Sequence, residues 1–166
     1  MSNSSVNIRQ VTDVISMRNQ ISAALGELSD QASKFILLSC EEDYFPHDED
    51  IASISLSEML SQTLLPLSKT KRESSVEDII ASLIDEALSN VVILKRIHVL
   101  FEPSLQLDPL KLLKELARQK PLIVFWPGIC NTVSISFSTP GRSDYQSYST
   151  NDLANVPIIR LVEHGE

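Results

Sequence analysis

The most conspicuous chemistry in this sequence lies in residues 41–50, where six of the ten side chains are carboxylates. Carboxylate oxygens are ligands for hard cations, and the imidazole of His47 adds a nitrogen ligand. The segment has no glycine, so it does not match the calcium-binding loop of an EF-hand. A solvated acidic loop is the simplest interpretation. A protein-binding loop anchored by its two aromatic residues is the main alternative, and its candidate residues are Glu41, Glu42, Asp43, Tyr44 and Phe45.

Side chains that could form a nucleophilic pair are also present. They are Ser39, Cys40, Cys130, His47, His98 and His164. Neither G-x-S-x-G nor C-x-x-C occurs in the chain, so the spacing selects no nucleophile. Both cysteines fall at the ends of predicted strands, where a buried, inert role is the commoner one. We expect His98 to be a structural histidine that follows a strand.

The composition indicates a soluble globular protein with one domain, residues 1–166. The net charge of −8 argues against a uniformly basic surface for nucleic acid. No apolar run approaches the ~20 residues of a membrane span, and the first residues lack the features of a secretory signal. Two cysteines do not make a disulfide framework. We therefore expect a cytoplasmic protein whose thiols are reduced.

Hydrophobic periodicity predicts the elements that must position these side chains. Nearly continuous apolar runs predict strands at 34–40, 51–55, 91–94, 122–126 and 158–162, and alternation predicts an edge strand at 133–137. Helices are expected at 11–28, 57–65 and 75–88, and from Pro109 onward. Their predicted N-caps are Thr12, Ser75 and Asp108.

Besides the acidic segment 41–50, three segments outside these elements carry predictions of their own. Residues 1–10 are expected to be flexible, and residues 68–73 to form a basic loop. Residues 138–151 are expected to form an exposed polar loop, on which tyrosine and arginine could serve as interface residues. The candidate partner-binding residues there are Arg142, Tyr145 and Tyr148.

Strands that alternate with helices and are apolar along their whole length indicate a parallel sheet covered on both faces. The fold class that follows is α/β, a three-layer sandwich with a mostly parallel sheet.

Residues 51–148 resemble the BrxF family, the small P-loop protein of type three BREX phage-defence systems. The most specific part of the resemblance is 100–128, with Leu100–Leu105, Asp108-Pro109-Leu110, Trp126 and Gly128. Pro140-Gly141, Tyr145 and Tyr148 are similar to the C-terminal loop of that family. The resemblance implies a P-loop NTPase-like fold in a defence system.

The sequence departs from that family where nucleotide would bind. The resemblance places a Walker A loop after the strand at 34–40, but acidic residues follow there, with neither glycine nor lysine. The interval before the strand at 51–55 is also too short for a phosphate loop and a crossover helix, which need about a dozen residues. At the Walker B position, Lys95 replaces the magnesium-binding acid and His98 stands where a second acid is expected.

These losses predict a degenerate NTPase fold that binds no cofactor. Together with them, the resemblance implies a non-catalytic adaptor that assembles larger defence proteins. Two alternatives remain open. One is a nucleotide- or metal-dependent enzyme with an unusual site around His47. The other is a DNA-binding accessory protein that uses the basic residues at 69–72.

Overall fold

The structure is a computed structural model that describes residues 8–40, 51–64, 66–131, 134–149, 151–154 and 156–162. The acidic segment 41–50, with Glu41, Glu42, Asp43, Tyr44 and Phe45, lies outside the described residues, as does His164.

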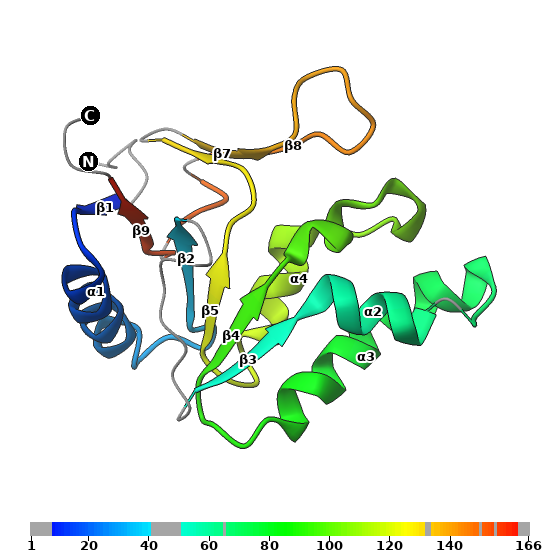
Figure 1. The fold of residues 1–166 in the computed structure, drawn as a ribbon, viewed down its shortest axis with the longest axis horizontal. Coiled ribbons are helices and arrows are strands. Elements are labelled where there is room, and N and C mark those ends of the chain that lie inside the picture. The colour runs from blue at the N-terminus through cyan, green and yellow to red at the C-terminus, as the bar shows by residue number, and fades with distance from the viewer. Residues whose placement is uncertain are drawn as a thin grey trace.

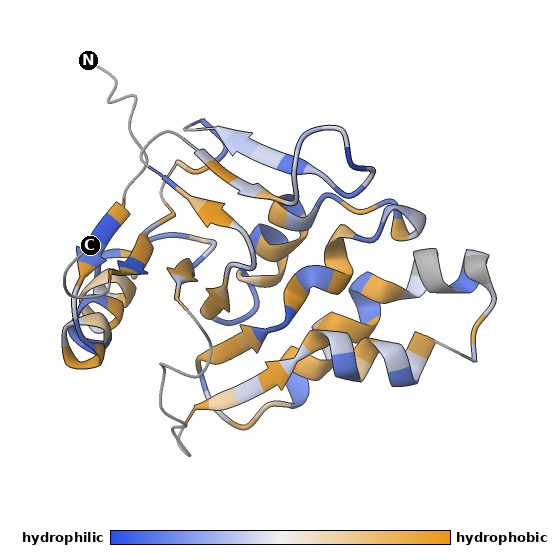
Figure 2. Ribbon diagram, turned by 45° about the horizontal axis from the view of Figure 1, so that its top comes forward, coloured by the Kyte–Doolittle hydropathy of each residue, from blue (hydrophilic) through white to orange (hydrophobic). Residues whose placement is uncertain are grey.

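Six parallel strands form the main sheet in the order β1-β9-β2-β5-β4-β3. Their bounds are β1 Ile8–Val11, β2 Phe35–Ser39, β3 Ala52–Ser55, β4 Val92–Lys95, β5 Leu122–Phe125 and β9 Ile158–Leu161. The central strands β2 and β5 are apolar at almost every position because both of their faces are covered. Figure 2 shows the hydrophobic residues concentrated in these strands.

Helices cover both faces of this sheet, which gives three layers (Figure 1). On one face α1 (Val14–Glu27) packs against Ile36 and Leu38 of β2. On the other face Phe35 and Leu37 point into a core shared with α2, α3 and α4. These helices span Leu56–Leu64, Lys69–Glu86 and Pro109–Leu116, and two short 3-10 turns, η2 (Ile97–Phe101) and η3 (Pro103–Leu105), follow β4. The predicted α/β sandwich is confirmed.

Helices α1, α3 and α4 start after side-chain caps, and two of the predicted caps are wrong. Asp108 caps α4 as expected, with the Lys111 N–H donating to its carboxylate at 3.3 Å. Helix α1 is capped by Asp13, which accepts the Ser16 N–H at 2.7 Å, rather than by Thr12. Helix α3 starts at Lys69 behind the Ser68 cap, so residues 69–73 are its first turns and not a basic loop.

Part of the expected flexible N-terminus is a strand. Residues Ile8–Val11 form β1, whose partner β9 comes from the other end of the chain. Sequence periodicity could not reveal this pairing, because four residues are too few to show a pattern.

A second, antiparallel sheet contains β6 (Ile129–Cys130), β7 (Ser134–Phe137) and β8 (Gln146–Ser149). The expected edge strand at 133–137 is therefore the middle strand of a separate sheet, and the expected loop at 138–151 contains a strand. Gly128 allows this sheet to approach β5, because a Cβ on it would lie 1.8 Å from the Ser136 carbonyl oxygen.

An aromatic cluster joins the two sheets, and we call Phe101, Trp126, Phe137 and Tyr148 the aromatic joint. The rings of Phe101 and Phe137 stack at 4.0 Å, and Trp126 meets Phe101 edge-on at 5.5 Å. The Trp126 indole N–H donates to the Ser136 carbonyl at 3.0 Å.

The prediction that Tyr148 is exposed is wrong. Its ring is buried, and its hydroxyl donates to Asp108 at 3.0 Å and accepts the Leu110 N–H at 3.3 Å. Burial is the main reason why the pKa of Tyr148 lies far above its usual range. Tyr148 thus ties β8 to the start of α4.

Candidate functional site

The carboxyl ends of parallel strands meet at one edge of a sheet, where α/β proteins commonly hold their ligands. At this edge β3 runs directly into α2 and β4 runs into η2. The two strands are neighbours, so the residues that follow them lie side by side. These residues are Ser57 and Glu58 after β3, and Arg96 and His98 after β4; we call the four the strand-end cluster.

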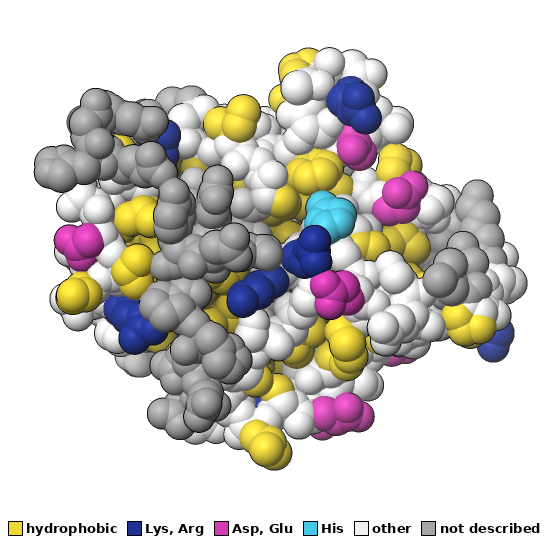
Figure 3. Space-filling model, in the orientation of Figure 1, with side chains coloured by type: hydrophobic (Ala, Val, Ile, Leu, Met, Phe, Trp, Pro, Cys, Tyr) yellow, Lys and Arg dark blue, Asp and Glu magenta, His cyan; other side chains and the backbone are white. Residues whose placement is uncertain are grey.

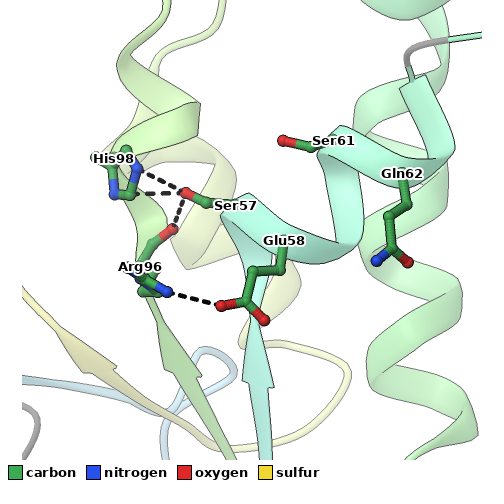
Figure 4. Close-up of a pocket in the computed structure, with 6 residues that line it drawn as sticks. All are labelled: Ser57, Glu58, Ser61, Gln62, Arg96 and His98. Atoms are coloured by element: carbon green, nitrogen blue, oxygen red, sulfur yellow. Dashed lines mark hydrogen bonds and ion pairs between the residues drawn. The ribbon is translucent and has the colours of Figure 1, made fainter.

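Ser57 is the centre of this cluster (Figure 4). Its hydroxyl lies 2.6 Å from the Arg96 carbonyl oxygen and 2.9 Å from the Nε2 atom of His98. The backbone N–H of Ser57 donates to the same carbonyl at 3.2 Å. Both contacts of Ser57 with Arg96 therefore connect the end of β3 to the end of β4.

The separation of Ser57 and His98 is within the range of a nucleophile and its general base. The hydroxyl has a single proton, however, and the Arg96 carbonyl oxygen can only accept it. The His98 N–H then donates to the Ser57 oxygen, which is the reverse of the direction that activates a serine. In this arrangement the pair connects the two strand ends.

The backbone of Arg96 explains why its carbonyl faces Ser57. Arg96 has φ 50° and ψ 51°, the left-handed conformation that non-glycine residues rarely adopt. This conformation ends β4 sharply and starts η2. The Arg96 guanidinium then bonds Glu58 at 2.7 Å across the strand ends, on an exposed surface where such pairs contribute under about 1 kcal/mol.

An open hollow of about 480 Å³ lies over the cluster. Ser61 and Gln62 of α2 complete its wall, and both are shown in Figure 4. Figure 3 shows basic, acidic and histidine side chains gathered close together near the middle of this face. The residues that line the hollow are all polar or charged, and they include an acid, a base and hydroxyl groups.

The two residues at the predicted Walker B position are placed by this geometry. Lys95 is the last residue of β4, and its ammonium lies 6.0 Å from the centre of the Phe125 ring on β5. His98 belongs to the strand-end cluster, as described above. Both residues are therefore at the expected edge of the sheet.

The predicted partner-binding residues of the C-terminal half are not equivalent. Arg142 is exposed at the turn between β7 and β8, with its side chain 3.6 Å from Asp144. Tyr145 is half-buried in the same turn, and its N–H donates to the Arg142 carbonyl at 3.2 Å. A hydrogen bond from Ser138 is the main cause of the lowered pKa of Asp144. Arg142 and Tyr145 therefore remain candidate partner-binding residues. The burial of Tyr148 excludes it from that set.

Three residues of the strand-end cluster, Ser57, Glu58 and Arg96, were not predicted as site residues. A pattern in the sequence could have found two of them, because Ser57 and Arg96 each follow a predicted strand closely. Parallel neighbours place such residues together, but the order of the strands must be known first.

Neither a metal site nor a membrane span is found among the described residues. No group of three or more His, Cys, Asp or Glu side chains in that part of the chain could hold a metal ion. No helix formed by these residues has the length and apolar character needed to cross a bilayer.

We compared the chain with protein-family models, with curated proteins and with solved structures, and no match was found in any of the three.

Proposed function

We propose that this protein is a non-catalytic adaptor in an antiviral defence system similar to BREX, with a degenerate P-loop NTPase-like fold. The defence role rests on the resemblance of residues 51–148 to the BrxF family. The structure supports the geometry that this proposal requires, since β2 and β4 are parallel and separated only by β5. Their carboxyl ends, where the family would hold its Walker A and Walker B residues, share one edge of the sheet.

The observation that carries the proposal is the position of Lys95. A cation cannot replace the acid that holds magnesium in a P-loop NTPase. The Lys95 ammonium lies over the Phe125 ring, a contact that is favourable for a cation and costs about 0.5–1 kcal/mol to break. The end of β4 is therefore suited to internal packing rather than to metal-bound phosphate.

A nucleotide-binding assay tests whether the protein has lost the nucleotide site of a P-loop NTPase. The purified protein is titrated with a fluorescent ATP analogue in the presence and absence of magnesium. We expect no magnesium-dependent binding tighter than about 0.1 mM. Tighter, magnesium-dependent binding that the Lys95→Ala variant abolishes would contradict the proposal.

Co-purification tests the adaptor role. The tagged protein is expressed together with the genes that adjoin its own, and captured proteins are identified by mass spectrometry. We expect a larger defence protein to be captured without added nucleotide, and phage resistance to fall when this gene is deleted. Unchanged resistance in the deletion strain would refute the defence role.

A further inference from the structure

The sheet has two edges, and one of them adjoins a hollow. β3 is the last strand at that end, with no strand beyond it among the described residues. A hollow of about 440 Å³ runs along it, bounded by β3, by Glu58 and Met59 of α2, by Leu83 and Glu86 of α3, and by Ala87, which follows α3. We call this hollow the edge groove.

The outward main-chain groups of β3 can be identified from its hydrogen bonds. The Ala52 N–H donates to the Ser89 hydroxyl at 2.9 Å, and that hydroxyl donates to the Val91 carbonyl just before β4. The amide of Ala52 therefore points toward β4. Successive amides of a strand point to opposite sides, so those of Ser53 and Ser55 point away from β4 and along the edge groove. An exposed strand edge of this kind is a template for pairing with another strand.

The side chains around the groove add an apolar surface. Met59, which lines the groove, is 39% exposed. The Ser55 hydroxyl oxygen, also beside the groove, is buried and has no hydrogen-bond partner among the described residues. In Figure 3, hydrophobic and acidic side chains share the lower part of this face, where β3 and α3 lie in Figure 1.

The charged side chains at the edge groove indicate which kind of partner segment it would bind. Glu86 lines the groove and forms no ion pair with a described residue, whereas Glu58, also at the groove, is paired with Arg96. The nearby Lys120 ammonium is bonded to main-chain carbonyls at the end of α3, among them that of Ala87 at 2.7 Å. A second copy of this chain, with a net charge of −8, would bring like charges to the groove. A basic segment would be attracted.

We propose that the edge groove binds an extended segment of a partner protein as an additional strand beside β3. Main-chain bonds to Ser53 and Ser55 would provide affinity, and apolar and basic side chains of the segment would provide selectivity. The inference deepens the proposed adaptor function, since it names how the partner is held. It rests on that function only for the partner's identity.

The test uses a fluorescein-labelled peptide of about nine residues, in which lysine alternates with valine or leucine so that one face is apolar. Its binding to the full chain is followed by fluorescence anisotropy. We expect saturable binding in the micromolar range. The same peptide with N-methylated amides on the pairing side should lose at least tenfold in affinity, because the methyl groups remove its donors. Equal binding of both peptides would overturn the proposal.

Two variants of the protein complete the test. Ser53→Pro removes an outward N–H, a change that edge strands tolerate, and should weaken binding at least tenfold without changing the circular dichroism spectrum. Glu86→Lys should weaken binding several-fold, whereas the matched reversal Asp30→Lys, after α1, should not. Wild-type affinity in the Glu86→Lys variant would overturn the proposal even if Ser53→Pro failed to fold.

Two further results separate this proposal from the adaptor role. If the Ser53→Pro and Glu86→Lys variants still capture the defence partner, the adaptor role stands and the edge groove is not its docking site. If the peptide binds but no defence protein is captured, the groove stands and the adaptor role fails. Sedimentation that shows a dimer dissociated by Ser53→Pro would overturn the proposal in favour of self-pairing.

Discussion

The aromatic joint and the strand-end cluster use opposite physical means to connect neighbouring elements. The aromatic joint is buried, and its four rings hold the small sheet against the end of β5. The strand-end cluster is open to solvent and joins β3 to β4 through one hydroxyl, one carbonyl and one ion pair. Substitutions in the aromatic joint should therefore lower the stability of the folded state. Substitutions in the strand-end cluster should instead change what the surface can bind.

The difference shows that residue type alone does not identify a surface for partners. Tyrosine is common at interfaces, and Tyr148 was predicted as an interface residue for that reason. Its hydroxyl instead satisfies a buried N–H at the start of α4. Ser57 and Arg96 of the strand-end cluster, which were not predicted as site residues, lie at the edge of the sheet where ligands usually bind.

Gly128→Ala should give the largest effect, because the new methyl group would lie on the Ser136 carbonyl oxygen. The main chain of β7 would have to move, at a cost of about 3 kcal/mol or more. Thermal unfolding should show a fall in Tm of roughly 10 °C. The control is Gly26→Ala, since no atom lies within 4 Å of a Cβ there. Equal stability of the two variants would contradict the close approach of the two sheets.

Tyr148→Phe should destabilise the protein by about 1–2 kcal/mol, because it leaves the buried Leu110 N–H without an acceptor. Urea unfolding measures the loss. Tyr145→Phe, in the β7–β8 turn, is the matched control and should change little. If both substitutions are neutral, Tyr148 does not have the internal role assigned to it.

Alkaline pH should weaken the same region, because burial raises the pKa of the Cys130 thiol from 9.0 to about 11. The folded state holds this proton more tightly than the unfolded state, so the stabilisation is complete below pH 9 and is lost as pH rises toward 11. At pH 10 the expected loss relative to pH 7 is about 1 kcal/mol. Urea unfolding at the two pH values should show a smaller loss for Cys130→Ala. A loss of the same size in both proteins would assign the effect to other groups.

Ser57→Ala should have the smallest effect on stability, about 1 kcal/mol or less, because the hydrogen bonds it removes are exposed. Chemical unfolding measures it. A loss comparable with that of Gly128→Ala would remove the contrast between the two regions.

The parts of the fold that the sequence predicted are those controlled by local rules. The Asp108 cap and Pro109 marked the start of α4, and continuous apolar runs marked β2, β4 and β5. The three-layer class followed from these runs. Such rules need only neighbouring residues.

The sequence-based predictions failed where contacts between residues far apart in the sequence determine the structure. The chain at 134–137 alternates like any edge strand, and its pairing with both β6 and β8 makes it the middle of a second sheet. The strand-end cluster depends on β3 and β4 being neighbours, although residues of α2 and α3 separate them in sequence. The Ser68 cap was missed because Ser75, farther along the chain, was predicted as the cap of this helix.

The pairing of β1 with β9 has a consequence for synthesis on the ribosome. Ile8 is aligned with Ile158, and the Val162 N–H donates to the Val11 carbonyl at 2.8 Å. The nascent chain therefore carries an unpaired β1 until its last strand has left the exit tunnel. Contacts so far apart in sequence form slowly, and a chain waiting for them exposes apolar surface. The complete sheet can form only after β9 has left the ribosome, so a chain cut short before β9 would leave both β1 and β2 without a neighbour that the native sheet requires.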